Sequence, residues 1–272
     1  MHFTLGWQQF FKQEIDREDR EINLAKAALH YARNEYSDIN LEQYLVSLDR
    51  MARDIKEHLP ETRYPLKVIQ SINQYLFEEL GFTGDTKDYY NPENSFINKV
   101  IDRRSGIPIT LSIVYLEIAE RLDFPMVGIG MPGHFLIRPD FEDAGIFIDV
   151  FNKGEILFPQ DCQEKLKQIY QSPVELEASF FEPVSKRRML ARMLTNLKYI
   201  YFKKEQFVKA LSAIEAILIL FPRNPLEMRD RGLIYYQLYE WQKASEDLHF
   251  YLSLLPHAPD AREIRKLIEK MQ

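Results

Sequence analysis

A spacing of 34 residues that recurs near the C-terminus constrains the fold of this 272-residue chain more than any other feature. Residues of similar chemistry return at that interval: Tyr201 and Tyr235, Phe207 and Trp241, Ala210 and Ala244, Pro222 and Pro256, Pro225 and Pro259. Self-similarity at a period of about 20 to 50 residues is typical of stacked repeats, each one supersecondary unit. The apolar residues within each period follow helical spacing, so each unit is predicted to be a pair of helices.

The offsets of tyrosine, alanine and proline within this period resemble those of the tetratricopeptide repeat. Gly232 is the small residue expected where the two helices of the second copy cross, and Lys198 takes that position in the first copy. A tail of two such repeats and a capping helix is therefore predicted over residues 185–272.

This resemblance implies a protein or peptide partner that binds the concave face built from the first helix of each pair. The candidate binding residues on those helices are Lys198, Tyr199, Lys203 and Arg231. Basic side chains pair with carboxylates and tyrosine gives rigid contact area, so this face suits an acidic or C-terminal peptide. The same charges are equally compatible with ordinary solvated residues.

Upstream of the tail, the pattern of apolar residues changes along the chain. Helical stripes fill most of residues 1–80, and an almost completely apolar helix follows Gly106. Alternating segments then predict three strands, at residues 126–130, 134–138 and 146–151. Helices followed by consecutive strands indicate an α+β domain with an antiparallel sheet. The predicted parts are a helical N-terminal part at 1–90, an α+β core at 91–180 and the repeat tail at 185–272.

Three short segments carry the residues with chemical potential. A helix is predicted to start near Pro108, His134 lies in one predicted strand, and Asp149 lies in the next. A histidine can act as a base at neutral pH, and a neighbouring carboxylate fixes its tautomer. A thiol at a helix N-terminus would have a lowered pKa. The layout is that of a Cys-His-Asp enzyme, but no cysteine stands at the helix start.

These segments resemble the SirB-type transglutaminase-like family, in which such a core precedes tetratricopeptide-like repeats. The resemblance is carried by GIPITLSIVYLEIAERLDFP at 106–125, PGHFLIR at 132–138 and IDVFNKG at 148–154. It implies a papain/transglutaminase-like fold. The wider superfamily starts its central helix with Gly-x-Cys and places His and Asp on following strands. That match puts Pro108 at the nucleophile position and His134 and Asp149 at the other two positions. The chain is therefore predicted to be a non-catalytic protein-interaction or adaptor protein.

Two alternatives remain open at this point. Thr110 and Ser112 lie near the first turn of the same helix, and either hydroxyl can serve an amide hydrolase or acyl transferase if a base is aligned with it. The pair formed by His134 and Asp149 is equally compatible with a polar contact that only fixes the fold.

Composition narrows the remaining function classes. The net charge of −6 gives no general support for nucleic-acid binding. The single cysteine, Cys162, cannot form an internal disulfide and fits a reducing compartment. The longest apolar run, residues 216–221, is too short to span a membrane. The N-terminus lacks the pattern of a secretory signal, and the six histidines are scattered without metal-ligand spacing. We expect a cytoplasmic protein without metal or cofactor.

Overall fold

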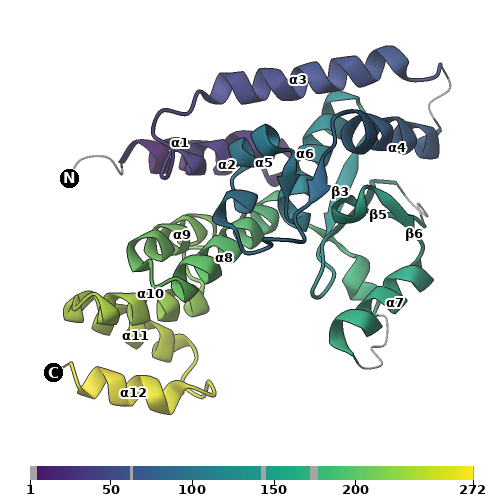
Figure 1. Ribbon diagram of the computed structural model, residues 1–272. Helices are drawn as coiled ribbons and strands as arrows, with labels where there is room; N and C mark the ends of the chain where they lie inside the picture. The colour runs from purple at the N-terminus through teal and green to yellow at the C-terminus, as the bar shows by residue number, and fades with distance from the viewer. Residues whose placement is uncertain (1–4, 62–63, 142–144, 172–176, 272) are drawn as a thin grey trace. The chain divides into compact units, whose positions relative to one another are not determined.

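The computed structural model describes residues 5–61, 64–141, 145–171 and 177–271. Residues 1–4, 62–63, 142–144, 172–176 and 272 of the predicted domains lie outside the described residues. The chain forms two compact units, Met1–Met193 and Leu194–Gln272, and Figure 1 traces both from purple to yellow. The division falls inside helix α8 (Lys186–Lys203). The finer boundaries at residues 90 and 180 stay a prediction. No helix in the described ranges is long and apolar enough to cross a membrane.

The first unit is built around one buried helix. Helix α6 (Pro108–Arg121) is buried at every position from Pro108 to Ala119. It packs against α2, α3 and α5 and also against strands β3 and β4. The predicted apolar central helix is therefore confirmed. The other helices of this unit are α1 (Leu5–Ile15), α2 (Leu24–Ala32), α3 (Leu41–His58), α4 (Pro65–Asn73), α5 (Ile97–Arg103) and α7 (Pro159–Tyr170). Short helical turns are η1 (Asp19–Glu21), η2 (Gln74–Glu79), η3 (Pro92–Ser95), η4 (Val150–Asn152) and η5 (Ala178–Phe181).

A five-stranded sheet lies beside α6, in the order β6-β5-β4-β3-β7. Its strands are β3 (Met126–Ile129), β4 (Leu136–Pro139), β5 (Phe147–Asp149), β6 (Glu155–Leu157) and β7 (Pro183–Val184). Every neighbouring pair is antiparallel, so the predicted α+β class with an antiparallel sheet is confirmed. A small parallel pair, β1 (Thr83–Gly84) and β2 (Ser105–Gly106), precedes α6.

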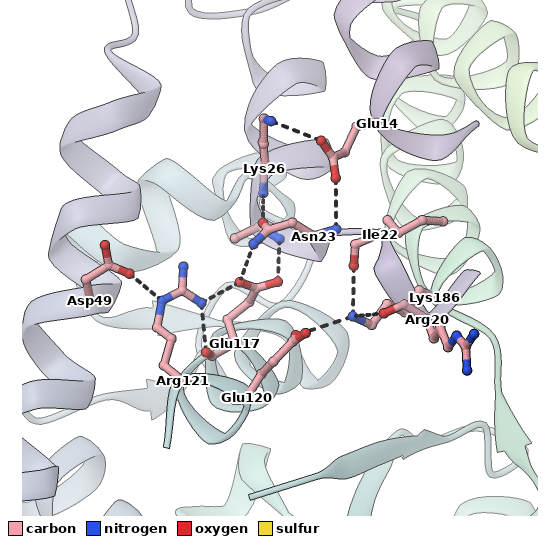
Figure 2. A network of polar contacts seen from close by, with 11 residues as sticks. Glu14, Arg20, Ile22, Asn23, Lys26, Asp49, Glu117, Glu120, Arg121 and Lys186 are labelled. Atoms are coloured by element: carbon pink, nitrogen blue, oxygen red, sulfur yellow. Dashed lines mark hydrogen bonds and ion pairs between the residues drawn. The ribbon is translucent and has the colours of Figure 1, made fainter. Parts of the chain in front are cut away.

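Glu117 joins α6 to the start of α2. Its carboxylate is almost completely buried and accepts hydrogen bonds from Asn23 Nδ2 at 3.1 Å, Ala25 N–H at 3.1 Å and Arg121 Nη1 at 2.7 Å. The first N–H groups of a helix have no partner within the helix, and they favour a nearby negative charge. Glu117 satisfies one of them from a different element, and Figure 2 shows this carboxylate at the centre of a wider polar network.

A second set of contacts fastens the start of α8 to η1, both within the first unit. The Asp19 carboxylate accepts from the backbone N–H groups of Lys186 at 2.8 Å and Arg187 at 3.1 Å. The Lys186 ammonium donates back to the carbonyl oxygens of Arg20 at 3.0 Å and Ile22 at 2.8 Å. Asp19 therefore supplies the acceptor that the first turn of α8 needs.

The second unit consists of paired helices, as the 34-residue period predicts. They are the end of α8, then α9 (Phe207–Leu220), α10 (Pro225–Gln237), α11 (Trp241–Leu254) and α12 (Ala261–Glu269). Ala210 and Ala244 are fully buried. A Cβ added to Gly232 would lie 2.9 Å from Leu248 Cγ and 3.2 Å from the Ala244 carbonyl oxygen, so α10 and α11 cross closely there. The capping helix α12 packs Ile264 and Ile268 against α11.

Candidate functional site

The N-terminus of α6 begins with a proline. Pro108 occupies its first turn, where the missing backbone N–H is no loss and the fixed φ favours the helix. Thr110 completes the start, because its Oγ1 accepts from the Ile107 N–H at 3.2 Å and donates to the Asn94 carbonyl at 2.7 Å. The proline side chain at this position consists of ring carbons only and offers no nucleophilic group.

His134 lies in a tight turn just before β4. Its N–H donates to the Met131 carbonyl at 3.0 Å, with Pro132 and Gly133 between them and Gly133 at a φ of 75°. This is the residue pattern of a type II turn. The predicted strand at 134–138 is therefore wrong at its beginning, since β4 starts at Leu136. The His134 N–H donates within this turn and therefore does not donate to a neighbouring strand.

His134 and Asp149 lie side by side, as predicted. His134 Nε2 is 2.8 Å from Asp149 Oδ2, because antiparallel pairing of Ile137 with Ile148 places β4, which follows His134, beside β5, which ends at Asp149. The imidazole is 13% exposed, whereas Asp149 is fully buried. Asp149 is the last residue of β5 and also accepts from the Asn152 N–H at 3.2 Å, so it caps the turn η4 as well.

Several donors converge on the buried Asp149 carboxylate. Besides His134, they are Asn152 Nδ2 at 2.8 Å and Lys165 Nζ at 3.0 Å. Burial acts to raise the pKa of Asp149, but the hydrogen bonds from His134, Asn152 and Lys165 outweigh it and hold that pKa well below its usual range. The carboxylate is consequently ionised at every physiological pH. One of its four hydrogen bonds and ion pairs is the contact that orients the His134 ring.

Aromatic and basic side chains surround the histidine. The Phe151 ring lies 6.4 Å from the His134 ring and 6.0 Å from the Tyr89 ring. Arg192 donates to the His134 carbonyl at 2.9 Å and lies over the Phe135 ring. Burial lowers the pKa of Arg192, and no carboxylate among the described residues pairs with it. We call His134, Asp149, Phe151, Tyr89 and Arg192 the His134 cluster.

The alternative nucleophiles are buried away from solvent. Thr110 and Ser112 are both 0% exposed, and neither hydroxyl has a hydrogen bond to His134 among the described residues. Cys162 is also fully buried, in α7, and burial raises the pKa of its thiol to about 11. A thiol with that pKa is almost entirely protonated at neutral pH, and the protonated form is a poor nucleophile.

Comparison with known proteins decides the family. The profile of the transglutaminase-like superfamily matches residues 42–195, which include α6, the sheet and the whole His134 cluster. The chain belongs to this superfamily. A tetratricopeptide repeat profile matches residues 197–269, so the predicted combination of a transglutaminase-like core and a repeat tail is confirmed.

Relatives of this transglutaminase-like chain include proteins of similar length. It is 34% identical to a UPF0162 protein of Xylella fastidiosa strain 9a5c, over 91% of this chain and 89% of the relative. It is 27% identical to a UPF0162 protein of Vibrio cholerae, over 94% and 95% of the two chains. F-box only protein 21 of mouse is 28% identical over 66% of this chain, which corresponds to 29% of that protein.

The four predicted binding residues lie in the repeat tail of this transglutaminase-like protein, and two of them have ion-pair partners there. Lys198 contacts Glu227 at 2.8 Å and Asp230 at 2.9 Å. Arg231 makes a two-pronged contact with Asp247, at 2.7 Å for each bond. Their charges are therefore compensated inside the tail. Tyr199 is 45% exposed and has the Lys203 ammonium over its ring at 4.6 Å.

Residues that sequence reasoning did not select are Tyr89, Phe151, Lys165 and Arg192. They reach the candidate site from a loop, a helical turn and two helices. The tyrosine pair at 89–90 within a turn-rich loop was a usable signal, because exposed aromatic residues on loops commonly contact ligands.

Proposed function

We propose that this chain is a pseudoenzyme, that is, a non-catalytic protein-interaction protein built on a transglutaminase-like core. The observation that carries the proposal is Pro108 at the start of α6. In a Cys-His-Asp enzyme this helix terminus presents the thiolate, whose pKa the helix dipole lowers. A proline ring at this place cannot attack a carbonyl carbon. A cytoplasmic location is part of the proposal and rests on the lone buried cysteine.

The second candidate function is an amide hydrolase or acyl transferase that uses Thr110 or Ser112. The close contact between His134 and Asp149 favours it, because an oriented imidazole is what a hydroxyl nucleophile needs. The burial of both hydroxyls and the use of Thr110 as a helix-start contact speak against it. We therefore favour the non-catalytic function.

The chain is expected to show neither amine incorporation nor thiol-protease turnover. Purified protein is incubated with a glutamine peptide and a fluorescent amine, and separately with an iodoacetamide probe at neutral pH. We expect no amine incorporation above a heat-denatured control, and probe labelling of Cys162 only after unfolding, because the native thiol is buried and protonated.

The control variants distinguish the two candidate functions. Cys162→Ala and His134→Ala are expected to behave like the unmodified chain in the amine assay. Turnover that disappears in Ser112→Ala, with an unchanged melting curve, would establish the hydroxyl enzyme and refute the pseudoenzyme. Turnover that disappears in Cys162→Ala would refute both.

We further propose that the repeat tail supplies the main surface for a protein or peptide partner. Stacked helical repeats commonly bind other chains, and Tyr199 provides an exposed aromatic ring of the kind enriched at interface hot spots. The pairing of Lys198 and Arg231 within the tail makes them supports of that surface more than direct contacts.

Tyr199→Ala is expected to reduce recovery of partners about tenfold in a quantitative pull-down from the native cell lysate, which corresponds to ~1.4 kcal/mol and is the cost of truncating one of the more important residues of an interface. Val208→Ala is the matched control, because Val208 is an exposed apolar residue of α9 in the same unit. Undiminished recovery with Tyr199→Ala, together with loss of partners in His134→Ala, would move the binding surface to the His134 cluster.

A further inference from the structure

A groove of about 620 Å³ lies in the first unit, away from the residues of the His134 cluster. Its lining combines the apolar residues Leu116, Met126, Val127, Val184 and Met189 with the carboxylate of Glu120. The volume is within the range of sites that hold a small ligand or a few side chains. None of the roles proposed above uses this groove.

One wall of the groove is an incomplete sheet edge. Strand β3 pairs with β4 along its whole length, from Met126 to Ile129. On its other side, β7 pairs only with Gly128 and Ile129. Met126 and Val127 therefore have no strand neighbour on that side among the described residues, and both line the groove. Such an edge is a template for a strand from another chain.

The rim of the groove is acidic. Asp123 and Asp140 lie at one end, where the Asp140 N–H donates to the Pro125 carbonyl at 2.9 Å. Both are exposed, and neither takes part in an ion pair among the described residues. Glu120 adds a third carboxylate that is 59% exposed.

Among the described residues, the basic side chains of the rim pair with Glu120 and Glu18 but not with Asp123 or Asp140. The Lys186 ammonium already contacts two carbonyl oxygens and, at 3.3 Å, Glu120. Figure 2 shows Lys186 reaching from α8 toward these acceptors. Arg20 is 84% exposed and pairs with Glu18. Asp123 and Asp140 are therefore available to pair with a cationic group of another molecule.

We propose that this groove binds an extended segment of a partner protein in which apolar residues alternate with lysine or arginine. The segment adds a strand beside Met126 and Val127, continuing the edge where β7 stops. Its apolar side chains fill the groove, and its cations face Asp123, Asp140 and Glu120. Backbone pairing gives affinity that is independent of sequence, whereas the pocket and the charged rim select the side chains.

The negative charge of the groove's rim argues against other ligands that would fit the same groove. An acidic segment would place carboxylates against three carboxylates, and like charges across an interface are strongly unfavourable. A second copy of this chain carries a net charge of −6 and would have to present an unusually basic segment. A small apolar molecule would leave the strand edge and the carboxylates unused.

The test uses the full chain and short fluorescent peptides, with binding followed by anisotropy. One peptide alternates valine with lysine, and the second alternates valine with glutamate. We expect the lysine peptide to bind at least about tenfold more tightly, with affinity that falls as salt rises. A third peptide carries N-methyl groups on its valines, which removes backbone donors, and we expect its affinity to fall about tenfold or more.

Variants that remove carboxylates test whether the lysine peptide binds at the acidic rim of the groove. Asp123→Asn with Asp140→Asn is expected to weaken the lysine peptide about fivefold, the effect of losing two exposed charge contacts. Asparagine suits position 123, whose φ is 58°. Glu42→Gln with Glu57→Gln removes the same charge from exposed positions of α3 and is expected to change nothing. Equal binding of the lysine and glutamate peptides, no loss on N-methylation, or equal effects of the two double variants would overturn the proposal.

Discussion

Replacing Ala244 by arginine is expected to unfold the repeat tail. Ala244 is fully buried in α11, and its carbonyl lies where a Cβ on Gly232 would be in close contact. An arginine there forces a long stem into a close helix crossing and buries an unpaired charge. Overpacking costs about 1–3 kcal/mol and the buried charge several more, a total of the same order as the stability of a whole domain, about 5–15 kcal/mol.

Circular dichroism melts and limited proteolysis would measure this effect. The matched control is Gln242→Arg, which introduces the same residue into the same helix at an exposed position. Gln242 contacts Glu246 at 3.1 Å, and an arginine can keep that contact one turn away. A melting midpoint for Ala244→Arg equal to that of Gln242→Arg would contradict the close crossing of α10 and α11.

Replacing Glu117 by alanine is expected to destabilise the core by about 3–5 kcal/mol, the usual result of removing one partner of a buried ion pair. The change removes the acceptor of the Ala25 N–H and leaves the Arg121 guanidinium, which is 19% exposed, with Asp49 and a backbone carbonyl. Both α2 and α6 lose a contact that no other residue replaces. Urea unfolding of the full chain, followed by tryptophan fluorescence, would report the loss.

Two further variants make the Glu117 experiment specific. Glu117→Gln keeps one acceptor oxygen but turns an amide NH₂ toward existing donors, so we expect an intermediate loss of about 1–3 kcal/mol. Glu120→Gln alters an exposed carboxylate one turn along the same helix, and its effect is expected to stay below ~1 kcal/mol. If Glu120→Gln lowered the free energy of unfolding as much as Glu117→Ala, the buried network around Glu117 would contribute little to stability.

Local patterns in the sequence were sufficient for much of the fold. Pro108 after a glycine predicts a helix start because its ring prefers the first turn, and α6 begins there. The alanines at 210 and 244 predict close helix packing because they recur in register, and both are fully buried. In each case the relevant neighbours lie within one helix or one repeat, where spacing alone determines which residues share a face.

Contacts between distant segments were beyond that reasoning. Lys198 stands where the second repeat has Gly232, and its spacing gives no sign that Glu227 and Asp230 receive its ammonium. Arg192 belongs by sequence to a basic helix start, yet it reaches the His134 carbonyl 58 residues away. The pairing of His134 with Asp149 was predictable because two successive predicted strands carry these residues and because the family pattern supplied the same long-range information.

The position of β7 determines when, during synthesis, the core can be completed. Strands β3 to β6 follow one another along the chain and can pair as soon as they leave the ribosome. Residues 183–184 must instead return to β3, and Lys186 must reach Asp19 across 167 residues. Contacts of such long sequence separation form late. The groove beside β3 has its second wall only after this return, so a partner that binds there would recognise chains whose core is complete and not shorter nascent chains.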